Sequence, residues 1–257
     1  MLKAVIFDLD NTLIDWGKFF GKWEEVEDPN VGAVYNYLLT ISDPSPSGDM
    51  KAYKQAYFRH TREAWEHGSL THEAPHMGRT LVKAAATGGF ATENVDARSC
   101  LEAYSGSNID GVTVFPETVE VLTTLRDNNI NLGLITNGYS PMWMRDKEMK
   151  HHDLLEFFPD CRFSSADEGY LKPHPHIFMK ALARLQVSAK EAVFVGDNLR
   201  ADVGGAQGVG MRGVWRITSS NGGILKDDIV PDAKINNLKD LLLLLDKWFP
   251  GWNKQVR

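Results

Sequence analysis

Short apolar runs alternate with stretches of helical periodicity over most of the chain. The apolar runs, at which we predict strands, span residues 3–7, 131–136, 192–196 and 213–216, with a weaker one at 161–164. A continuous apolar run between polar residues is typical of a strand buried on both faces. Between them, helical patterns cover residues 117–127, 176–185 and 238–248. Strands that alternate with helices predict an α/β fold with a mainly parallel sheet.

Residues 16–112 interrupt this alternation. They contain no strong strand run, and aromatic-rich helical stretches occupy residues 49–65 and 79–86. A segment of this length is large enough to have its own small core. We therefore predict an α/β core domain made of residues 1–15 and 113–257, and a helical cap domain made of residues 16–112.

The composition narrows the range of partners. Of the 257 residues, 28 are basic and 34 are acidic, which gives a net charge of −6. Because there is no basic excess, we expect neither nucleic acid nor a membrane surface as a partner. The longest aliphatic run, Leu241–Leu245, is far shorter than the ~18 residues of a spanning helix. The start of the chain is too acidic for a signal peptide, and two cysteines make no disulfide framework. We expect a cytoplasmic protein, as a monomer or homodimer.

Residues capable of chemistry follow the predicted strands. They are Asp8 and Asp10, then Thr136, then Lys172, and finally Asp197 with Asp202. Ligands of open parallel sheets bind at the carboxyl ends of the strands, so these side chains are expected to converge. Carboxylates held close together repel one another unless a cation or a proton is shared. An all-oxygen cluster of this kind favours Mg²⁺.

A phosphate group is the guest that this set of residues favours. The Lys172 ammonium would neutralise charge on the phosphoryl oxygens. Thr136 and the backbone amide of Asn137 could donate hydrogen bonds to the same oxygens. Asn137 and Gly138 also favour a tight turn, which exposes backbone amides.

Four segments carry a resemblance to a known family. FDLDNTL at 7–13, LITNG at 134–138, LKPHPHIF at 171–178 and VGDNLRADVGGAQGVGM at 195–211 resemble the four ordered motifs of the haloacid dehalogenase superfamily of hydrolases. The resemblance covers the whole α/β part. It implies a Rossmann-like core, and the insertion resembles the family's helical cap of the first type.

The resemblance implies a role for each matching residue. Asp8 would be the nucleophile that forms an aspartyl-phosphate. Asp10 would protonate the leaving alcohol and then activate water. Mg²⁺ would be held by Asp8, the backbone carbonyl of Asp10, and Asp197. Three further residues would support the site. Asp202 would assist the metal-bound waters or hold Lys172 in place, and Asn198 would lie in the same surroundings. Thr12 would shape the turn after the nucleophile.

Asp10 separates two branches that the resemblance allows. Dehalogenases of this family resemble phosphatases but lack an acid here, because a halide leaves without a proton. We therefore expect a Mg²⁺-dependent phosphatase that hydrolyses a small phosphorylated metabolite, a phosphomonoester. Two alternatives stay open, a 2-haloacid dehalogenase and a non-catalytic phospho-accepting or ligand-sensing protein.

Four further features have competing interpretations. The string His72-Glu73-Ala74-Pro75-His76 matches a zinc-protease pattern, but Pro75 interrupts a helix, so we predict a loop. The glycines at 204–210 lack the order of a dinucleotide-binding loop and indicate close packing. Aromatic residues after the first motif either fill the cap core or line the entrance above Asp8; they are Trp16, Phe19, Phe20 and Trp23. Arginines of the cap are solvated or meet a substrate anion; they are Arg59, Arg62 and Arg79.

Overall fold

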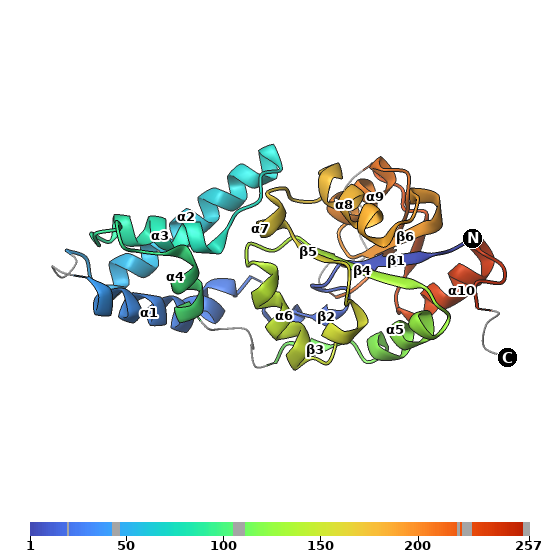
Figure 1. Cartoon of the computed structure of the whole chain (residues 1–257), viewed down its shortest axis with the longest axis horizontal. Coiled ribbons are helices and arrows are strands. Elements are labelled where there is room, and N and C mark those ends of the chain that lie inside the picture. Colours follow the sequence, from blue (N-terminus) through green and yellow to red (C-terminus); the bar gives the residue numbers. More distant parts are fainter. Residues whose placement is uncertain (20, 43–46, 105–110, 220–221, 223–227, 254–257) are drawn as a thin grey trace.

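A six-stranded parallel sheet forms the centre of the larger part of the molecule (Figure 1). The computed structural model describes residues 1–19, 21–42, 47–104, 111–219, 222 and 228–253. The strands are β1 (Ala4–Phe7), β4 (Asn131–Thr136), β5 (Arg162–Ser164), β6 (Ala192–Gly196), β7 (Arg212–Arg216) and β8 (Ala233–Ile235). Their order is β5-β4-β1-β6-β7-β8. The chain builds outward from β1 in one direction and then in the other, so the strand order reverses beside β1, where such sheets bind ligands.

Helices cover both faces of the sheet. On one face, α5 (Thr118–Asp127) and α10 (Lys239–Trp248) pack against Val5 and Phe7. On the other, α8 (Pro175–Leu185) packs against Ala4 and Ile6, beside the short helix α9 (Gly205–Gly208). Side chains of a strand alternate between the two faces, so β1 contributes to both cores and is fully buried. The predicted α/β class is confirmed.

The described helices between β2 (Ile14–Asp15) and β3 (Thr113–Val114) form a separate group, which we call the helical insertion. It contains η1 (Gly17–Phe19), α1 (Trp23–Ile41), α2 (Met50–Thr71), α3 (Met77–Thr87) and α4 (Ala97–Tyr104). These helices enclose their own hydrophobic cluster, to which Met144 of the core also contributes. In Figure 1 the insertion lies to the left of the sheet.

Both connections to the insertion pass through one antiparallel pair of strands. β2 (Ile14–Asp15) leads into the insertion and β3 (Thr113–Val114) leads out of it. Ile14 pairs with Val114, and Asp15 pairs with Thr113. The insertion therefore begins and ends at the same place on the core.

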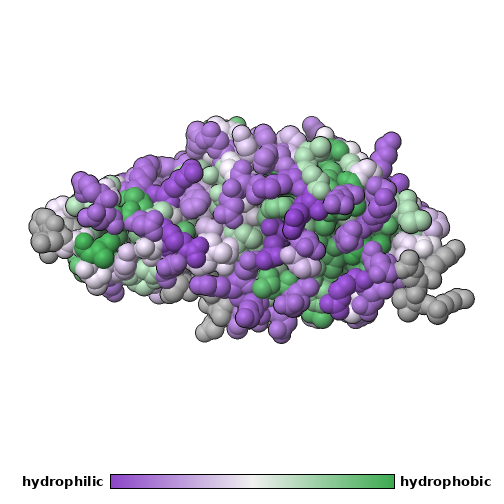
Figure 2. Space-filling model, viewed as in Figure 1, coloured by the Kyte–Doolittle hydropathy of each residue, from purple (hydrophilic) through white to green (hydrophobic). Residues whose placement is uncertain are grey.

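The strands agree with the predicted apolar runs to within a residue, because continuous burial leaves a strong signal. Helix α2 extends to Thr71, beyond its predicted end at 65. Several elements were not predicted. Among them are α1, whose sequence contains Pro29, the helices α4 and α6 (Met142–His151), and the three-residue strand β8. Within the described residues, no helix combines the length and hydropathy needed to cross a bilayer. On the face in Figure 2, hydrophilic residues cover most of the surface, and hydrophobic residues lie in smaller areas.

Candidate active site

Asp8 follows β1 directly and lies at the carboxyl end of the sheet. Its backbone N–H donates to the Val195 carbonyl over 2.9 Å, so pairing with β6 continues through this residue. Thr12 Oγ1 donates to Asp8 Oδ2 over 3.0 Å, and both residues are buried. Thr12 thus holds the Asp8 carboxylate in one orientation, which is more than the turn-shaping role that the sequence predicted for it.

Lys172 supplies positive charge at this edge. Its Nζ lies 2.8 Å from Asp8 Oδ1 and 2.7 Å from Asp202 Oδ1, and it donates to the Ile135 carbonyl over 2.9 Å. The side chain is only 1% exposed. Although burial opposes the charged form, Asp202 and Asp8 raise the pKa of Lys172, so the side chain stays an ammonium.

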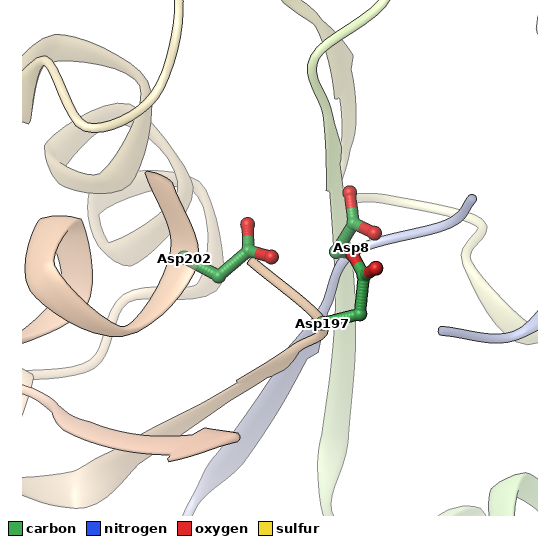
Figure 3. Close-up of side chains that lie close together, drawn as sticks. All are labelled: Asp8, Asp197 and Asp202. Carbon is green, nitrogen blue, oxygen red and sulfur yellow. The ribbon is translucent and has the colours of Figure 1, made fainter. Parts of the chain in front are cut away.

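Three carboxylates converge around Lys172. Oxygens of Asp8, Asp197 and Asp202 lie within 4.8 Å of one another. In Figure 3 the Asp8 and Asp197 carboxylates lie beside each other, and Asp202 approaches from the helical turn that follows β6. The Asp197 carbonyl accepts a hydrogen bond from Trp215 Nε1 over 2.8 Å, which anchors the backbone at the end of β6.

The cluster carries more negative charge than Lys172 can balance. Burial raises the pKa of Asp8 to about 7, even though Lys172 opposes the shift. Burial, followed by repulsion from Asp8 and Asp202, raises the pKa of Asp197 to about 8. A divalent cation would favour the ionised forms of both groups, and the donors are all oxygen, as hard cations prefer. The cluster therefore fits a metal ion.

Asp202 uses both of its carboxylate oxygens within the protein. Oδ1 faces Lys172, and Oδ2 accepts the backbone N–H of Asn198 over 2.9 Å. Gly196 makes room for this carboxylate, because a Cβ at that position would lie 2.3 Å from it. Of the two roles that the resemblance allows for Asp202, these contacts favour holding Lys172 in place.

The Asn198 side chain caps the helical turn η4 (Leu199–Gly204). Its Oδ1 accepts backbone N–H groups from Arg200 over 3.1 Å and from Ala201 over 2.9 Å. A side-chain oxygen of this kind stabilises a helical start by satisfying its free N–H groups. This contact orients the segment that carries Asp202.

Thr136 and Asn137 end β4 on the other side of β1. Thr136 Oγ1 lies 3.5 Å from Asp10 Oδ2, and Thr136 is fully buried. The Asn137 side chain makes two hydrogen bonds to the backbone of Lys172, at 3.0 Å to its carbonyl and at 2.8 Å from its N–H. Asn137 thus fixes the loop that delivers Lys172, a contact that the sequence did not predict.

Arg145 contacts Asp10, and the sequence analysis missed it. Its Nη2 lies 2.5 Å from Asp10 Oδ1, and its Nη1 lies 2.8 Å from Glu148 Oε2. Both residues belong to α6 (Met142–His151), where a spacing of three places them on one face. Arg145 therefore orients the Asp10 carboxyl group. The sequence carried no signal for this contact, because the helix that carries Arg145 was not predicted.

A cavity of about 520 Å³ opens between the helical insertion and this edge of the core. Asp10, Asn137 and Arg145 line its core side. Its other walls include Trp16, Trp23 and Arg62. The sequence left open whether the aromatic residues after Asp8 line an entrance, and these two tryptophans do. Phe19 instead packs against the core, and Phe20 lies outside the described residues. The cavity gives a substrate access to Asp10.

The segment with the zinc-protease pattern is a loop, as predicted. His72 ends α2 with a left-handed backbone, at φ 64°, and His76 precedes the first residue of α3. The His72 carbonyl accepts the Leu171 N–H over 2.8 Å, next to Lys172. The loop therefore joins the insertion to the Lys172 segment.

Of the glycines at 204–210, Gly205 packs closely against a neighbouring helix, since a Cβ there would lie 2.5 Å from the Phe178 ring.

Comparison with known proteins agrees with a hydrolase site on this fold. The model of the haloacid dehalogenase-like hydrolase family matches residues 2–210. The chain belongs to this family. It is 30% identical to a glyceraldehyde 3-phosphate phosphatase of Pyrococcus abyssi, over 100% of this chain and 98% of the relative. A protein of the same name from Methanocaldococcus jannaschii is 33% identical, with 94% and 96% covered.

Solved structures also resemble the chain over nearly its whole length. A 2-haloacid dehalogenase from Pseudomonas syringae has a TM-score of 0.69 at 29% identity, with 96% of this chain and 100% of that chain covered. A HAD phosphatase from Thermococcus onnurineus has a TM-score of 0.61 at 23% identity, with 95% and 98% covered. The second similarity concerns the fold alone.

Proposed function

We propose that the protein is a Mg²⁺-dependent phosphatase of small phosphomonoesters, with Asp8 as nucleophile and Asp10 as general acid and base. The observation that carries this proposal is the Asp10 carboxyl group, which lies beside Thr136 and Arg145 at the edge that holds Asp8. An alkoxide is a poor leaving group without a proton, whereas a halide leaves as the anion. Relatives named as phosphatases support the same choice.

In the first step, a carboxylate oxygen of Asp8 attacks phosphorus and the bond from phosphorus to the alcohol oxygen breaks. Asp10 gives its proton to that oxygen, and the alcohol departs. Arg145, at 2.5 Å, stabilises the carboxylate that remains on Asp10. The product is a phosphoryl group carried by Asp8.

In the second step, Asp10 takes a proton from a water molecule, and the resulting hydroxide attacks phosphorus. The bond to Asp8 breaks, the Asp8 carboxylate is restored and inorganic phosphate is released. Lys172, 2.8 Å from Asp8, balances the negative charge of the phosphoryl oxygens in both steps.

Asp8, Asp197 and the backbone carbonyl of Asp10 would hold the magnesium ion. The ion would offset repulsion between the carboxylates and the incoming phosphate, and would stabilise charge in the transition state. This role fits the carboxylate cluster, whose raised pKa values reflect burial and a shortage of positive charge.

The test is hydrolysis of p-nitrophenyl phosphate by the full chain, with Mg²⁺ and with EDTA. We expect turnover with Mg²⁺ and loss of turnover with EDTA. Asp8→Asn keeps the size of the side chain but removes the nucleophilic carboxylate, so kcat should fall at least about 10³-fold. The matched control is Asp127→Asn, an exposed residue of α5, which should keep wild-type activity.

Equal rates for wild type and Asp8→Asn would contradict the role of Asp8. Because one similar structure is that of a 2-haloacid dehalogenase, halide release from chloroacetate without Mg²⁺ is measured in parallel. Halide release without phosphate release would overturn the phosphatase proposal. A long-lived phosphorylated Asp8 without turnover would favour a phospho-accepting protein instead.

A further inference from the structure

The cavity above Asp10 is large for a short alcohol. It measures about 520 Å³. A triose leaving group has about six non-hydrogen atoms, and at the ~30 Å³ that a water molecule occupies in the liquid it would fill about 180 Å³. A hexose or a nucleoside has two to three times as many atoms and would use most of the space. The cavity therefore has room for an alcohol larger than a triose.

The walls of this cavity are aromatic. Three tryptophans from different segments line it, Trp16, Trp23 and Trp65, together with Tyr139 of the core. Edge-to-face contacts set the ring positions: Trp65 lies 6.1 Å from Tyr139, at 64°, and Trp23 lies 5.5 Å from Phe58, at 75°. Aromatic side chains bind flat groups by stacking and lose little conformational freedom in doing so. Such walls are suited to a ring.

Both arginines that line the cavity already have partners within the protein. Arg62 pairs with Glu24, and Arg145 pairs with both Asp10 and Glu148. A leaving group with a second anion, such as a carboxylate or another phosphate, would have to compete with these carboxylates. The arrangement therefore favours a leaving group that carries no charge.

Glu27 offers such a group a polar contact. This residue of α1 lines the cavity and accepts hydrogen bonds from the hydroxyl groups of Tyr57 (3.0 Å) and Tyr139. Burial raises the pKa of Glu27 to about 8, so the carboxyl group holds a proton at neutral pH. Because both oxygens of Glu27 already accept from tyrosines, the group that remains for a ligand is its O–H donor, which suits a hydroxyl or carbonyl oxygen on a ring.

We propose that the alcohol part of the substrate is neutral and carries a ring, a sugar or a nucleobase, which binds against Trp65, Trp23 and Trp16. This inference rests on the proposed phosphatase function. It assigns recognition of the phosphate to the core, and recognition of the ring to the insertion and Tyr139.

The test compares kcat/KM for wild type with Mg²⁺ over a panel of esters. Hexose 6-phosphates and nucleoside 5′-monophosphates carry a ring, whereas glyceraldehyde 3-phosphate and glycerol 3-phosphate do not. We expect the best ring-bearing ester to exceed both others at least about tenfold, the scale of one stacking contact. Which ring-bearing ester is best distinguishes a sugar from a base.

Trp65→Ala removes one wall of the cavity and should lower kcat/KM for the best ring-bearing ester about tenfold, mainly through KM. The value for glyceraldehyde 3-phosphate should change less than about threefold, and Trp65→Phe, which keeps a ring, should restore part of the loss. The matched control is Leu70→Ala on the same helix, since Leu70 is 84% exposed and lies outside the cavity. It should behave as wild type.

The outcomes separate this inference from the proposed function. Turnover of neither p-nitrophenyl phosphate nor any ester in the panel would overturn the phosphatase proposal, and this inference with it. Turnover of p-nitrophenyl phosphate but of no ring-bearing ester would overturn the inference alone. Preferred turnover of the triose ester, or an equal effect of Trp65→Ala on ring-bearing and triose esters, would overturn the inference alone.

Discussion

Asp8 in the core and Glu27 in the helical insertion are both carboxyl groups removed from water. Burial raises the pKa of Asp8 to about 7 and that of Glu27 to about 8. The two groups are nevertheless compensated differently. Asp8 faces the ammonium of Lys172 at 2.8 Å, whereas Glu27 accepts hydrogen bonds from two tyrosine hydroxyls.

The difference lies in the charge of the partners. The ammonium of Lys172 favours the ionised form of Asp8, which nucleophilic attack and metal binding require. Hydroxyl partners without a cation leave an acid protonated and neutral, which suits contact with a neutral group. Under the proposed function, charged groups of the core bind the phosphate, whereas the shape and hydrogen bonds of the insertion select the alcohol.

The largest expected effect tests whether the chemistry belongs to the core alone. Asp10→Asn should lower kcat for alkyl phosphates by about 10³-fold, because neither proton transfer can occur. The loss should be the same for ring-bearing and triose esters. With p-nitrophenyl phosphate, whose phenolate leaves without a proton, the variant should release one p-nitrophenol per enzyme in a burst, followed by slow turnover. Rapid-mixing absorbance measures it.

Wild-type turnover by Asp10→Asn would contradict the assigned role. A different loss of kcat for ring-bearing and triose esters would show that the reaction at Asp10 and the binding of the alcohol are not independent.

The next effect tests the charge compensation of the core. Lys172→Met leaves Asp8 and Asp202 buried without their cation, so the free energy of unfolding in EDTA should fall by about 3 kcal/mol at pH 7.5. The loss should be smaller at pH 5.5, where the carboxyl groups take up protons. Mg²⁺ should restore part of the stability. Urea unfolding followed by circular dichroism measures these differences.

The matched control for Lys172 is Lys180→Met. Lys180 also pairs with a carboxylate, Glu168, at 2.7 Å, but its side chain is 46% exposed. Water screens this pair, so removing it should cost less than about 1 kcal/mol at either pH. Equal losses for the two variants would show that Lys172 does not offset buried charge.

The smallest effect tests the protonated acid of the insertion. Folded Glu27 has a pKa of about 8, against 4.5 for the free side chain. Between these values the folded state binds one more proton than the unfolded state, so Glu27 weakens the fold as pH rises through this window. Glu27→Gln removes this dependence, and its unfolding free energy relative to wild type should rise by about 2 kcal/mol from pH 6 to 8.

Urea unfolding in EDTA measures the change, and titration of the core carboxylates cancels in the difference between the two proteins. Glu102→Gln is the control, because Glu102 is an exposed residue of α4. If Glu27→Gln and wild type have parallel pH profiles, Glu27 is ionised in the folded protein and the contrast with Asp8 fails.

The sequence predicted the core well because its signals are local. Residues of a doubly buried strand are apolar without interruption, as in Ala192–Gly196, and the residue at the carboxyl end of such a strand is placed by topology. That reasoning brought Asp8, Thr136 and Asp197 together before any contact was known, and their observed positions agree with it.

The cavity above Asp10 could not be predicted in the same way, because its walls come from segments far apart in the chain. Trp65 meets Tyr139, and Glu27 meets both Tyr57 and Tyr139, only after helices have packed. Arg145 lies in a helix rich in charged residues, where the sequence carries little sign of which side chain is buried. Residue type and strand topology are enough to predict the carboxylate cluster at the edge of the sheet. The cavity depends in addition on how the helices are placed relative to one another.

The pairing of β2 with β3 has a consequence for how the molecule can be altered. Since Ile14 and Val114 are neighbours across one backbone ladder, the whole insertion spans a gap no wider than that of a hairpin. A short turn, or a different set of helices, can in principle occupy the same opening without moving β1 or the residues that follow it. We therefore expect that the insertion can be exchanged while the strand that leads to Asp8 keeps its place.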